Sequence, residues 1–461
     1  MKKNKKPLLA LILLIIIGTI GVTIAYYTDI FEFPNLFKSK PYGTTSIETF
    51  TSPNNWTPGT VTPKSVVTTN KGDIDVAVRV SYTENWISKD GTSLPLTKQW
   101  ISDTRSSTND EYIKAAIIEF DNKSDWIKDG DYYYYNKKLS KGESTKSFIK
   151  SVKYNEYMES VANCTTSSDG KTQSCTAVDN EYQGGTYTLN VKIETIQFNA
   201  YKDAWNTDVE IGSTHSISEP NSFATDDWNV IANAVRNGNT SKYHVGDTKE
   251  VDLGDLGTHT VRIANMSTPE ECSSEGFSQT ACGFVVEFSD IVVTRSLQFY
   301  LGNSIVREGY GTNTNGGYKY TSIRGYLNYC LYDKLPEELR NSIIDTYTVS
   351  STSTVDNSIT NDKLYLLAAK EIYGDYNDSN FPDNASNLER QLDYYKAQGV
   401  NGMQSVVNSV AIKKYNSQKE NWWLRSSKSN DLYLSIYTGG NLEDWYPALN
   451  DDGISPAFRI G

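Results

Sequence analysis

The closing stretch of the sequence gathers aromatic and charged side chains that suit a polyhydroxylated ligand. The runs NWWLRSS, DLYLSIYTGG and LEDWYPALNDDG follow one another from Asn421 onward. If the first two form strands, their side chains alternate between the faces of a sheet. One face then carries Trp423, Arg425, Tyr433, Tyr437 and Trp445, with Asp444 and Tyr446 beside Trp445 in a loop. Aromatic rings stack on sugar C–H groups, and Arg or Asp binds hydroxyls, so these seven residues are the candidate ligand-binding site.

The same strand admits a second interpretation, in which both of its faces are core. Leu424 marks one face as buried. Trp423 and Arg425, on the other face, could be buried as well. Arg425 would then need a buried carboxylate, such as Asp362 or Glu371.

No motif predicts catalysis, a metal site or a cofactor. The sequence lacks the GxSxG, HExxH and phosphate-loop patterns. His215, His244 and His259 are scattered, without the spacing of metal ligands. The formal net charge is −12, which argues against nucleic acid as a partner. We therefore predict a non-enzymatic protein without catalytic residues, bound metal or cofactor.

Four of the five cysteines predict two disulfide-closed hairpin tips. Cys164 and Cys175 enclose one short polar loop, and Cys272 and Cys282 enclose another. This pattern is typical of exported proteins, whereas free surface thiols are the alternative. Cys330 is left over and is expected to be a small buried hydrophobe.

The first 25 residues predict export. The basic run MKKNKK precedes the apolar run PLLALILLIIIGTIGVTIA, and a small-x-small cleavage site lies between Ala25 and Tyr26. The apolar run is nearly long enough to span a bilayer core of about 30 Å. A cleaved signal peptide and an uncleaved membrane anchor both remain open. The rest of the chain is expected outside the cell, membrane-associated if the segment is not cleaved.

At 461 residues the chain is too long for one ordinary core. Residues 26–43 are predicted as an extended segment. Residues 44–205 contain strictly alternating runs such as IDVAVRVSY and YTLNVKIET, which predict a β-sandwich with one helix around TNDEYIKAAI. Residues 206–222 are polar and aperiodic, and are predicted as a linker.

Residues 223–461 predict an α+β domain, since helical patterns come first and short strands close the chain. TDDWNVIANAVRNGN has an apolar stripe and a terminal Gly238. Pro336 is expected to start a short helix. Ser386 and Glu389 are expected to form the capping box of another helix.

The N-terminal part resembles SipW-dependent TasA/camelysin-like exported proteins of Gram-positive bacteria. The resemblance rests on GTIGVTIAYYTD, WTPGTVTPKSVVTTNKGDIDVAVRVSYTENW, DWIKDGDYYYY, LSKGESTKSFIKSV and YTLNVKIETIQFNAYKDAW. It implies a β-sandwich outside the cell, in biofilm matrix or on the envelope, without catalysis.

The C-terminal part resembles an uncharacterised domain of bacterial surface proteins, through WNVIANAVRNG, GGYKYTSIRGYLN, NWWLRSS and GISPAFRI. Its ending also resembles the C-type-lectin-like fold of sulfatase-modifying-factor relatives and phage receptor-binding proteins. The enzymatic branch of that fold would need a late cysteine pair, and no cysteine follows Cys330.

Three functions follow as hypotheses. In the first, the C-terminal domain binds a glycan or a surface protein, as an adhesin does. In the second, the chain self-associates as a matrix or fibre subunit, because the apolar stretch YYTDIFEFPNLF could be donated as a strand to a neighbour's sheet. An enzyme is the third.

Overall fold

The computed structural model describes most of the chain in two compact units. It describes residues 28–32, 43–99, 112–121, 125–158, 161–166, 173–178, 181–212, 218–295, 300–301, 304–305, 318–350, 358–374, 386–400, 409–428, 432–445 and 451–461. The first unit comprises Met1–Leu96, Lys114–Glu159 and Asp179–His215, and the second comprises Thr97–Ile113, Ser160–Val178 and Ser216–Gly461. The division after His215 falls inside the predicted linker, whereas residues 97–113 and 160–178, predicted in the first domain, belong to the second unit.

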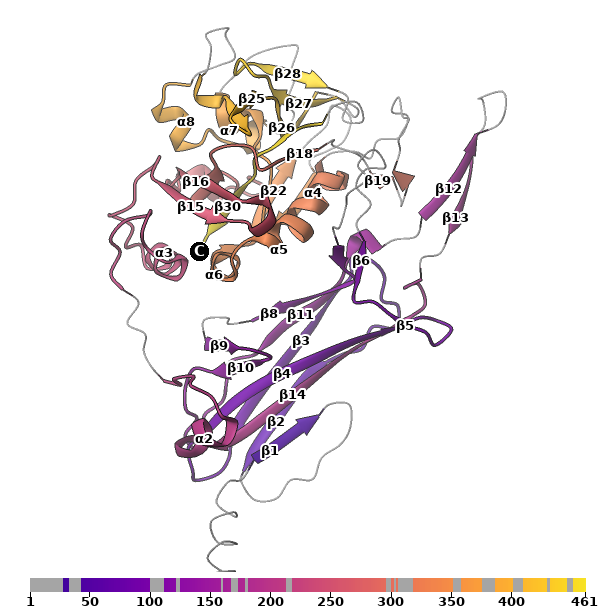
Figure 1. The fold of residues 1–461 in the computed structure, drawn as a ribbon, viewed down its shortest axis with the longest axis vertical. Helices are drawn as coiled ribbons and strands as arrows, with labels where there is room; N and C mark the ends of the chain where they lie inside the picture. Colours follow the sequence, from indigo (N-terminus) through magenta and orange to yellow (C-terminus); the bar gives the residue numbers. More distant parts are fainter. Residues whose placement is uncertain are drawn as a thin grey trace, which may run out of the picture. The chain divides into compact units, whose positions relative to one another are not determined.

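Two antiparallel sheets build the first unit (Figure 1). One sheet has the order β1 (Thr28–Glu32), β14 (Thr186–Gln197), β4 (Val76–Ile87), β10 (Tyr132–Tyr135) and β9 (Trp126–Asp129), with β5 (Ser93–Leu94) paired to β4. The other has the order β2 (Thr44–Phe50), β3 (Val61–Asn70), β11 (Ile149–Tyr154) and β8 (Ala116–Phe120). The short helix α2 (Tyr201–Trp205) follows β14.

The first residues of the central strand β4, from Val76 to Val78, are buried on both faces. Val76, Val78 and Val80 pack into a core with residues of both sheets, as their alternation predicts. Ala77, on the opposite face, packs in a second cluster with Trp205 of α2. The α2 helix therefore covers, around Ala77, part of the face that sequence alternation assigned to solvent.

The helix predicted around TNDEYIKAAI is wrong where the structure describes it. Tyr112–Lys114 form β7 and Ala116–Phe120 form β8. Ile113, Ala115 and Ala116 are buried, and β8 pairs with β11 in the second sheet. Tertiary pairing overrides local helix propensity here.

Two five-stranded sheets lie in the second unit. The first has the order β15 (Thr248–Asp252), β16 (Thr258–Asn265), β17 (Val285–Phe288), β30 (Ala457–Ile460) and β21 (Ile343–Ile344). The second has the order β18 (Val293–Arg295), β29 (Asp452–Ile454), β26 (Trp422–Ser427), β27 (Tyr433–Ile436) and β28 (Leu442–Trp445). The chain's last strand, β30, lies between two others, so the C-terminus is held inside a sheet.

Helices of the second unit are short. They are α3 (Trp228–Arg236), α4 (Ser322–Tyr326), the π-helical turn η7 (Leu327–Leu331), α5 (Tyr332–Lys334), α6 (Glu337–Ser342), α7 (Ala369–Tyr373) and α8 (Asp393–Ala397). The α3 helix has the predicted apolar stripe, with Trp228 and Ile231 buried. Pro336 directly precedes α6, as predicted.

Five two-stranded sheets and several 3₁₀ turns complete the described chain. The two-stranded sheets are β6 (Thr97–Gln99) with β7, β12 (Val161–Thr166) with β13 (Gln173–Val178), β19 (Tyr300–Leu301) with β20 (Ser304–Ile305), β22 (Thr346–Ser350) with β23 (Ser358–Asp362), and β24 (Lys413–Tyr415) with β25 (Gln418–Glu420). The turns are η2 (Glu156–Met158), η3 (Phe198–Ala200), η4 (Gly254–Leu256), η5 (Glu270–Ser273), η6 (Tyr318–Tyr320), η8 (Ser386–Leu388) and η9 (Ser409–Ala411). The protein is thus mostly β, with antiparallel sheets.

None of the helices in the described residues is long and apolar enough to cross a membrane. The predicted signal or anchor, including Ala25 and Tyr26, lies outside the described residues.

Candidate functional site

Strand β26 holds the residues on which the predicted ligand-binding face depends. All six of its residues are buried, on both faces of the sheet. The Trp422 indole N–H donates to the Ala411 carbonyl at 3.0 Å, and that of Trp423 donates to the Arg295 carbonyl at 2.8 Å. Both tryptophans are therefore core residues whose polar atoms are satisfied within the protein.

The predicted exposure of the aromatic face is wrong for Trp423, Arg425 and Tyr433. Their exposed fractions are 0%, 1% and 0%. Tyr437, beyond the end of β27, is 42% exposed, as predicted. The seven candidate residues therefore do not form one solvent-exposed surface.

The last three candidates lie on or after the edge strand β28. Asp444 is half-buried and forms an ion pair with Lys428, whose Nζ lies 2.8 Å from Asp444 Oδ2. Trp445 pairs with Tyr433 in the strand register, and its side chain lies outside the described part. Tyr446 lies outside the described residues altogether.

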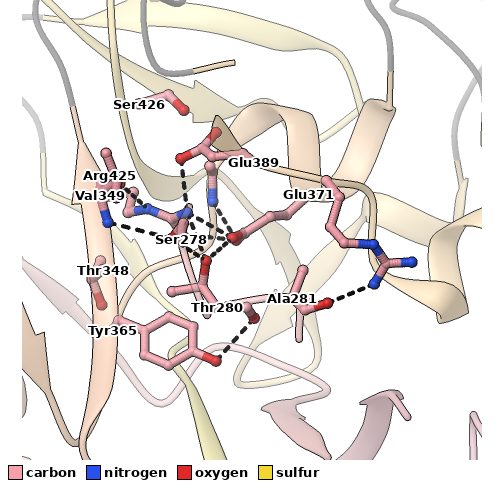
Figure 2. Close-up of polar contacts among 12 residues, drawn as sticks. Ser278, Thr280, Ala281, Thr348, Val349, Tyr365, Glu371, Glu389, Arg425 and Ser426 are labelled. Carbon is pink, nitrogen blue, oxygen red and sulfur yellow. Dashed lines mark hydrogen bonds and ion pairs between the residues drawn. The ribbon is translucent and has the colours of Figure 1, made fainter. Parts of the chain in front are cut away.

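Arg425 lies at the centre of a buried charge network instead (Figure 2). Its two terminal nitrogens donate to the two oxygens of Glu371, at 2.6 and 2.8 Å. Glu389 accepts a further bond from Nη2 at 2.8 Å. Of the two carboxylates proposed for Arg425, Glu371 is thus its partner, whereas Asp362 pairs with Arg324 at 2.7 Å.

Uncharged groups complete the coordination of the Arg425 guanidinium. Nε donates to the Val349 carbonyl at 3.1 Å, and Nη1 donates to the Leu366 carbonyl at 2.8 Å. Nη2 also donates to the Thr280 hydroxyl at 3.0 Å, and that hydroxyl donates to Glu371. Each guanidinium nitrogen has a protein acceptor, so the group joins distant segments rather than presenting donors to a ligand.

The electrostatics of Arg425 are those of a neutralised buried cation. Burial by itself would lower the pKa of the guanidinium, but Glu371 and then Glu389 raise it above its ordinary value. The guanidinium therefore stays charged at every pH at which the protein is folded.

A disulfide closes the loop that supplies Thr280 to this network. Cys272 and Cys282 are bonded, with an S–S distance of 2.00 Å. The other predicted pair, Cys164 and Cys175, is directly opposed in the register of β12 and β13, and these side chains lie outside the described part. Cys330 is buried and does not form a disulfide.

A second buried charge network lies on the other five-stranded sheet. Glu287 of β17 accepts from Arg262 at 2.9 Å, from Lys413 at 2.8 Å and from the Tyr395 hydroxyl at 3.0 Å. Burial opposes ionisation of Glu287, but Arg262 and Lys413 lower its carboxyl pKa below the ordinary range. Burial lowers the pKa of Lys413. Both networks tie the second unit together internally.

Sequence reasoning missed several members of these networks. Glu389 was assigned to a capping box, but it binds Arg425, and the predicted helix is reduced to η8 and α8. Thr280 and Glu287 carry no local pattern that marks them, since Thr280 is 91 residues from Glu371, and Glu287 is 25 residues from Arg262 and 126 from Lys413. Among the described residues, no group of His, Cys, Asp and Glu side chains could hold a metal ion.

Neither a curated protein nor a solved structure matches the chain. Residues 295–461 match a protein family described as a domain of unknown function, DUF6273. The matched stretch includes β26 and both carboxylate partners of Arg425.

Proposed function

We propose that the protein is an exported, surface-associated, non-enzymatic component of a Gram-positive envelope or biofilm matrix, and that it assembles by strand addition. The observation that carries this proposal is the pairing of β1 with β14. β1 lies at the edge of its sheet and pairs along its whole length, from Thr28 opposite Ile196 to Glu32 opposite Lys192. A strand from a neighbouring copy can form the same backbone hydrogen bonds.

The chain length between β1 and β2 suits such an exchange. Residues 33–43 separate the two strands. Eleven extended residues span up to about 36–40 Å, at ~3.3–3.6 Å per residue. That length lets β1 leave its own sheet while β2 stays in place.

The finer fold assignments belong to the same proposal. We take the first unit as a β-sandwich, because its main core draws Val66 and Ile149 from one sheet and Val78 and Val191 from the other. We take the second unit as C-type-lectin-like, supported by the antiparallel pairing of the closing strand β30 with β17.

A pair of cysteines tests strand exchange directly. In the variant Glu32→Cys/Lys192→Cys, the two cysteines are opposed in the β1–β14 register. Oxidation before assembly should lock β1 onto its own sheet and prevent fibres in the electron microscope. Oxidation after assembly should link neighbouring subunits into a covalent ladder on a denaturing gel.

Single-cysteine variants control for cross-links that do not depend on the register. If the double variant oxidised after assembly yields only internally bonded monomers, strand exchange is wrong. If the locked monomer still forms fibres, the N-terminal strand is not the assembly element.

Binding of a glycan or surface protein by the second unit is a second candidate function. The observation that favours it is Tyr437, a large aromatic ring that is 42% exposed next to the Gly439–Gly440 turn. Saturable binding on a glycan array should be lost in Tyr437→Ala while the melting temperature is unchanged. Retained binding in that variant would remove Tyr437 from the candidate surface.

We propose further that residues 1–25 direct export, as a cleaved signal peptide or as a membrane anchor. The basic run and the apolar run that follows it support this proposal. N-terminal sequencing of the protein recovered from medium and from membranes distinguishes the two forms. A mature chain that begins at Tyr26 is the result expected for cleavage.

A further inference from the structure

Strand β2 (Thr44–Phe50) has a neighbouring strand on one side only among the described residues of its sheet. With seven residues it is the longest edge strand in the part of the chain that the structure describes. It pairs with β3 in an unbroken register, from Thr44 opposite Asn70 to Phe50 opposite Lys64. The other edge of β2 therefore presents a row of backbone N–H and C=O groups that a further strand can pair with.

The edge of β2 lacks the features that usually keep edge strands from pairing, such as lysine, proline, a bulge or a short length. The sequence TTSIETF contains neither lysine nor proline. Its single charge, on Glu48, is compensated by an ion pair with the buried Lys64. By contrast, the edge strand β15 has three charged residues among five, and the register of β8 with β11 shifts between Ile149 and Ser151.

The outer face of β2 carries an exposed apolar side chain at the middle of the strand. Glu48 lies opposite Val66, which packs in the core between the two sheets, so the neighbouring residue Ile47 points away from that core. Ile47 is 59% exposed, and Thr45 and Thr49 on the same face are exposed as well. A strand added to this edge would cover part of the Ile47 side chain.

The sequence of β2 is complementary to itself when two copies run antiparallel with Ile47 at the centre. The opposed pairs are then Ile47 with Ile47, Thr45 with Thr49, Ser46 with Glu48, and Thr44 with Phe50. Two β-branched apolar side chains meet at the centre, with threonine pairs on either side, and both combinations stabilise antiparallel strands. Like charges are nowhere directly opposed, which is the arrangement that would destabilise the pair.

We propose that β2 is a dimerisation edge, at which it pairs antiparallel with β2 of a second copy of this chain around a two-fold axis through Ile47. The two four-stranded sheets then form one continuous sheet. Such a contact is the same patch on both copies, so it closes as a dimer. It lies on a different sheet from β1 and does not depend on the exchange of β1, which would build open-ended fibres.

Cysteine cross-linking of the full-length protein tests both the dimer and its register. Oxidised Ile47→Cys should run as a covalent dimer on a non-reducing denaturing gel, because the two introduced cysteines are directly opposed. Thr45→Cys and Thr49→Cys should each stay monomeric alone, since identical positions are then about 13 Å apart at ~3.3 Å per residue. An equal mixture of these two proteins should cross-link. The wild type, oxidised in the same way, measures the background from its own cysteines.

Disruption of the edge provides a second measurement. In Ile47→Lys two like charges are opposed, and sedimentation over a concentration series should show a dimer dissociation constant raised at least about tenfold. The matched control is Ile74→Lys, which changes another exposed isoleucine of the same unit, 49% exposed and outside β2, and should leave the dissociation constant unchanged.

The outcomes separate this inference from strand exchange. Covalent dimers of Ile47→Cys that form while fibres are absent support the β2 edge and count against the exchange of β1. Cross-linking of Ile47→Cys no greater than that of the wild type overturns the β2 dimer, as does equal cross-linking of Thr45→Cys alone. If Ile47→Lys does not fold, the cysteine series decides.

Discussion

Arg425 and Glu371, 54 residues apart in the chain, form a fully buried ion pair through two hydrogen bonds of 2.6 and 2.8 Å. The pair joins β26 to α7, and Glu389 adds a second carboxylate from the segment after η8. This ion pair explains why Arg425 follows Trp422 and Trp423 in a fully buried strand. The guanidinium neutralises the carboxylates that the surrounding segments bring into the core.

Removal of Arg425 should be among the most destabilising changes in the second unit. Arg425→Leu leaves Glu371 and Glu389 buried without their cation, and a loss of about 3–5 kcal/mol in the free energy of unfolding is expected. Urea unfolding followed by tryptophan fluorescence measures it. The control is Lys334→Ala, whose partner Asp255 is exposed and whose expected cost is below about 1 kcal/mol. Equal effects of the two substitutions would contradict the network's structural role.

Truncation should cost much stability at Trp423 and little at Tyr437. Trp423→Ala removes a fully buried ring, and a cost of about 3–5 kcal/mol is expected. Tyr437→Ala acts on an exposed ring and should change stability by no more than about 0.5 kcal/mol. Thermal unfolding of both variants measures the difference. A stable Trp423→Ala protein would show that this ring is not core.

Asp452 should make the second unit less stable as the pH rises. Burial, with Glu420, Asp451 and Glu443 nearby, raises the pKa of its carboxyl from 3.8 to about 6. The folded state therefore binds the proton more tightly than the unfolded state. The stabilisation is complete below pH ~4 and is lost as the pH rises through ~6, a change of about 3 kcal/mol at 1.36 kcal/mol per pKa unit.

The Asp452→Asn variant isolates this contribution. It should flatten the stability profile between pH 4 and pH 7 and be the more stable protein at pH 7. Urea midpoints at fixed pH values measure both effects. Identical slopes for the variant and the wild type would assign the pH dependence to other groups.

The disulfide between Cys272 and Cys282 should stabilise the folded protein, because it closes a loop and so restricts the unfolded chain. The cysteines are 10 residues apart. Loop-closure entropy for such a span predicts a loss of about 3 kcal/mol in Cys272→Ser/Cys282→Ser. Reducing agent should lower the melting temperature of the wild type and of Cys330→Ala by more than that of the double variant, in which only the predicted Cys164–Cys175 bond could still be reduced. A wild-type melting temperature that does not respond to complete reduction would rule out this contribution.

Local patterns in the sequence determined much of the secondary structure. The alternation of Val76, Val78 and Val80 predicted β4, and the apolar stripe of Trp228 and Ile231 predicted α3. These features depend on the period of a strand or helix, which neighbouring residues express. The sequence also predicted that a buried Arg425 needs a carboxylate partner, with Asp362 and Glu371 as examples, because a buried cation needs a counter-charge.

Only the tertiary structure decided which faces meet water. Alternation in β26 separates Trp422 and Leu424 from Trp423 and Arg425, but it cannot say whether a second layer covers either side. Segments distant in the chain cover both, so all four residues are buried. The same long-range packing gave Arg425 its carboxylates, because charge pairing depends on contacts that no local pattern records.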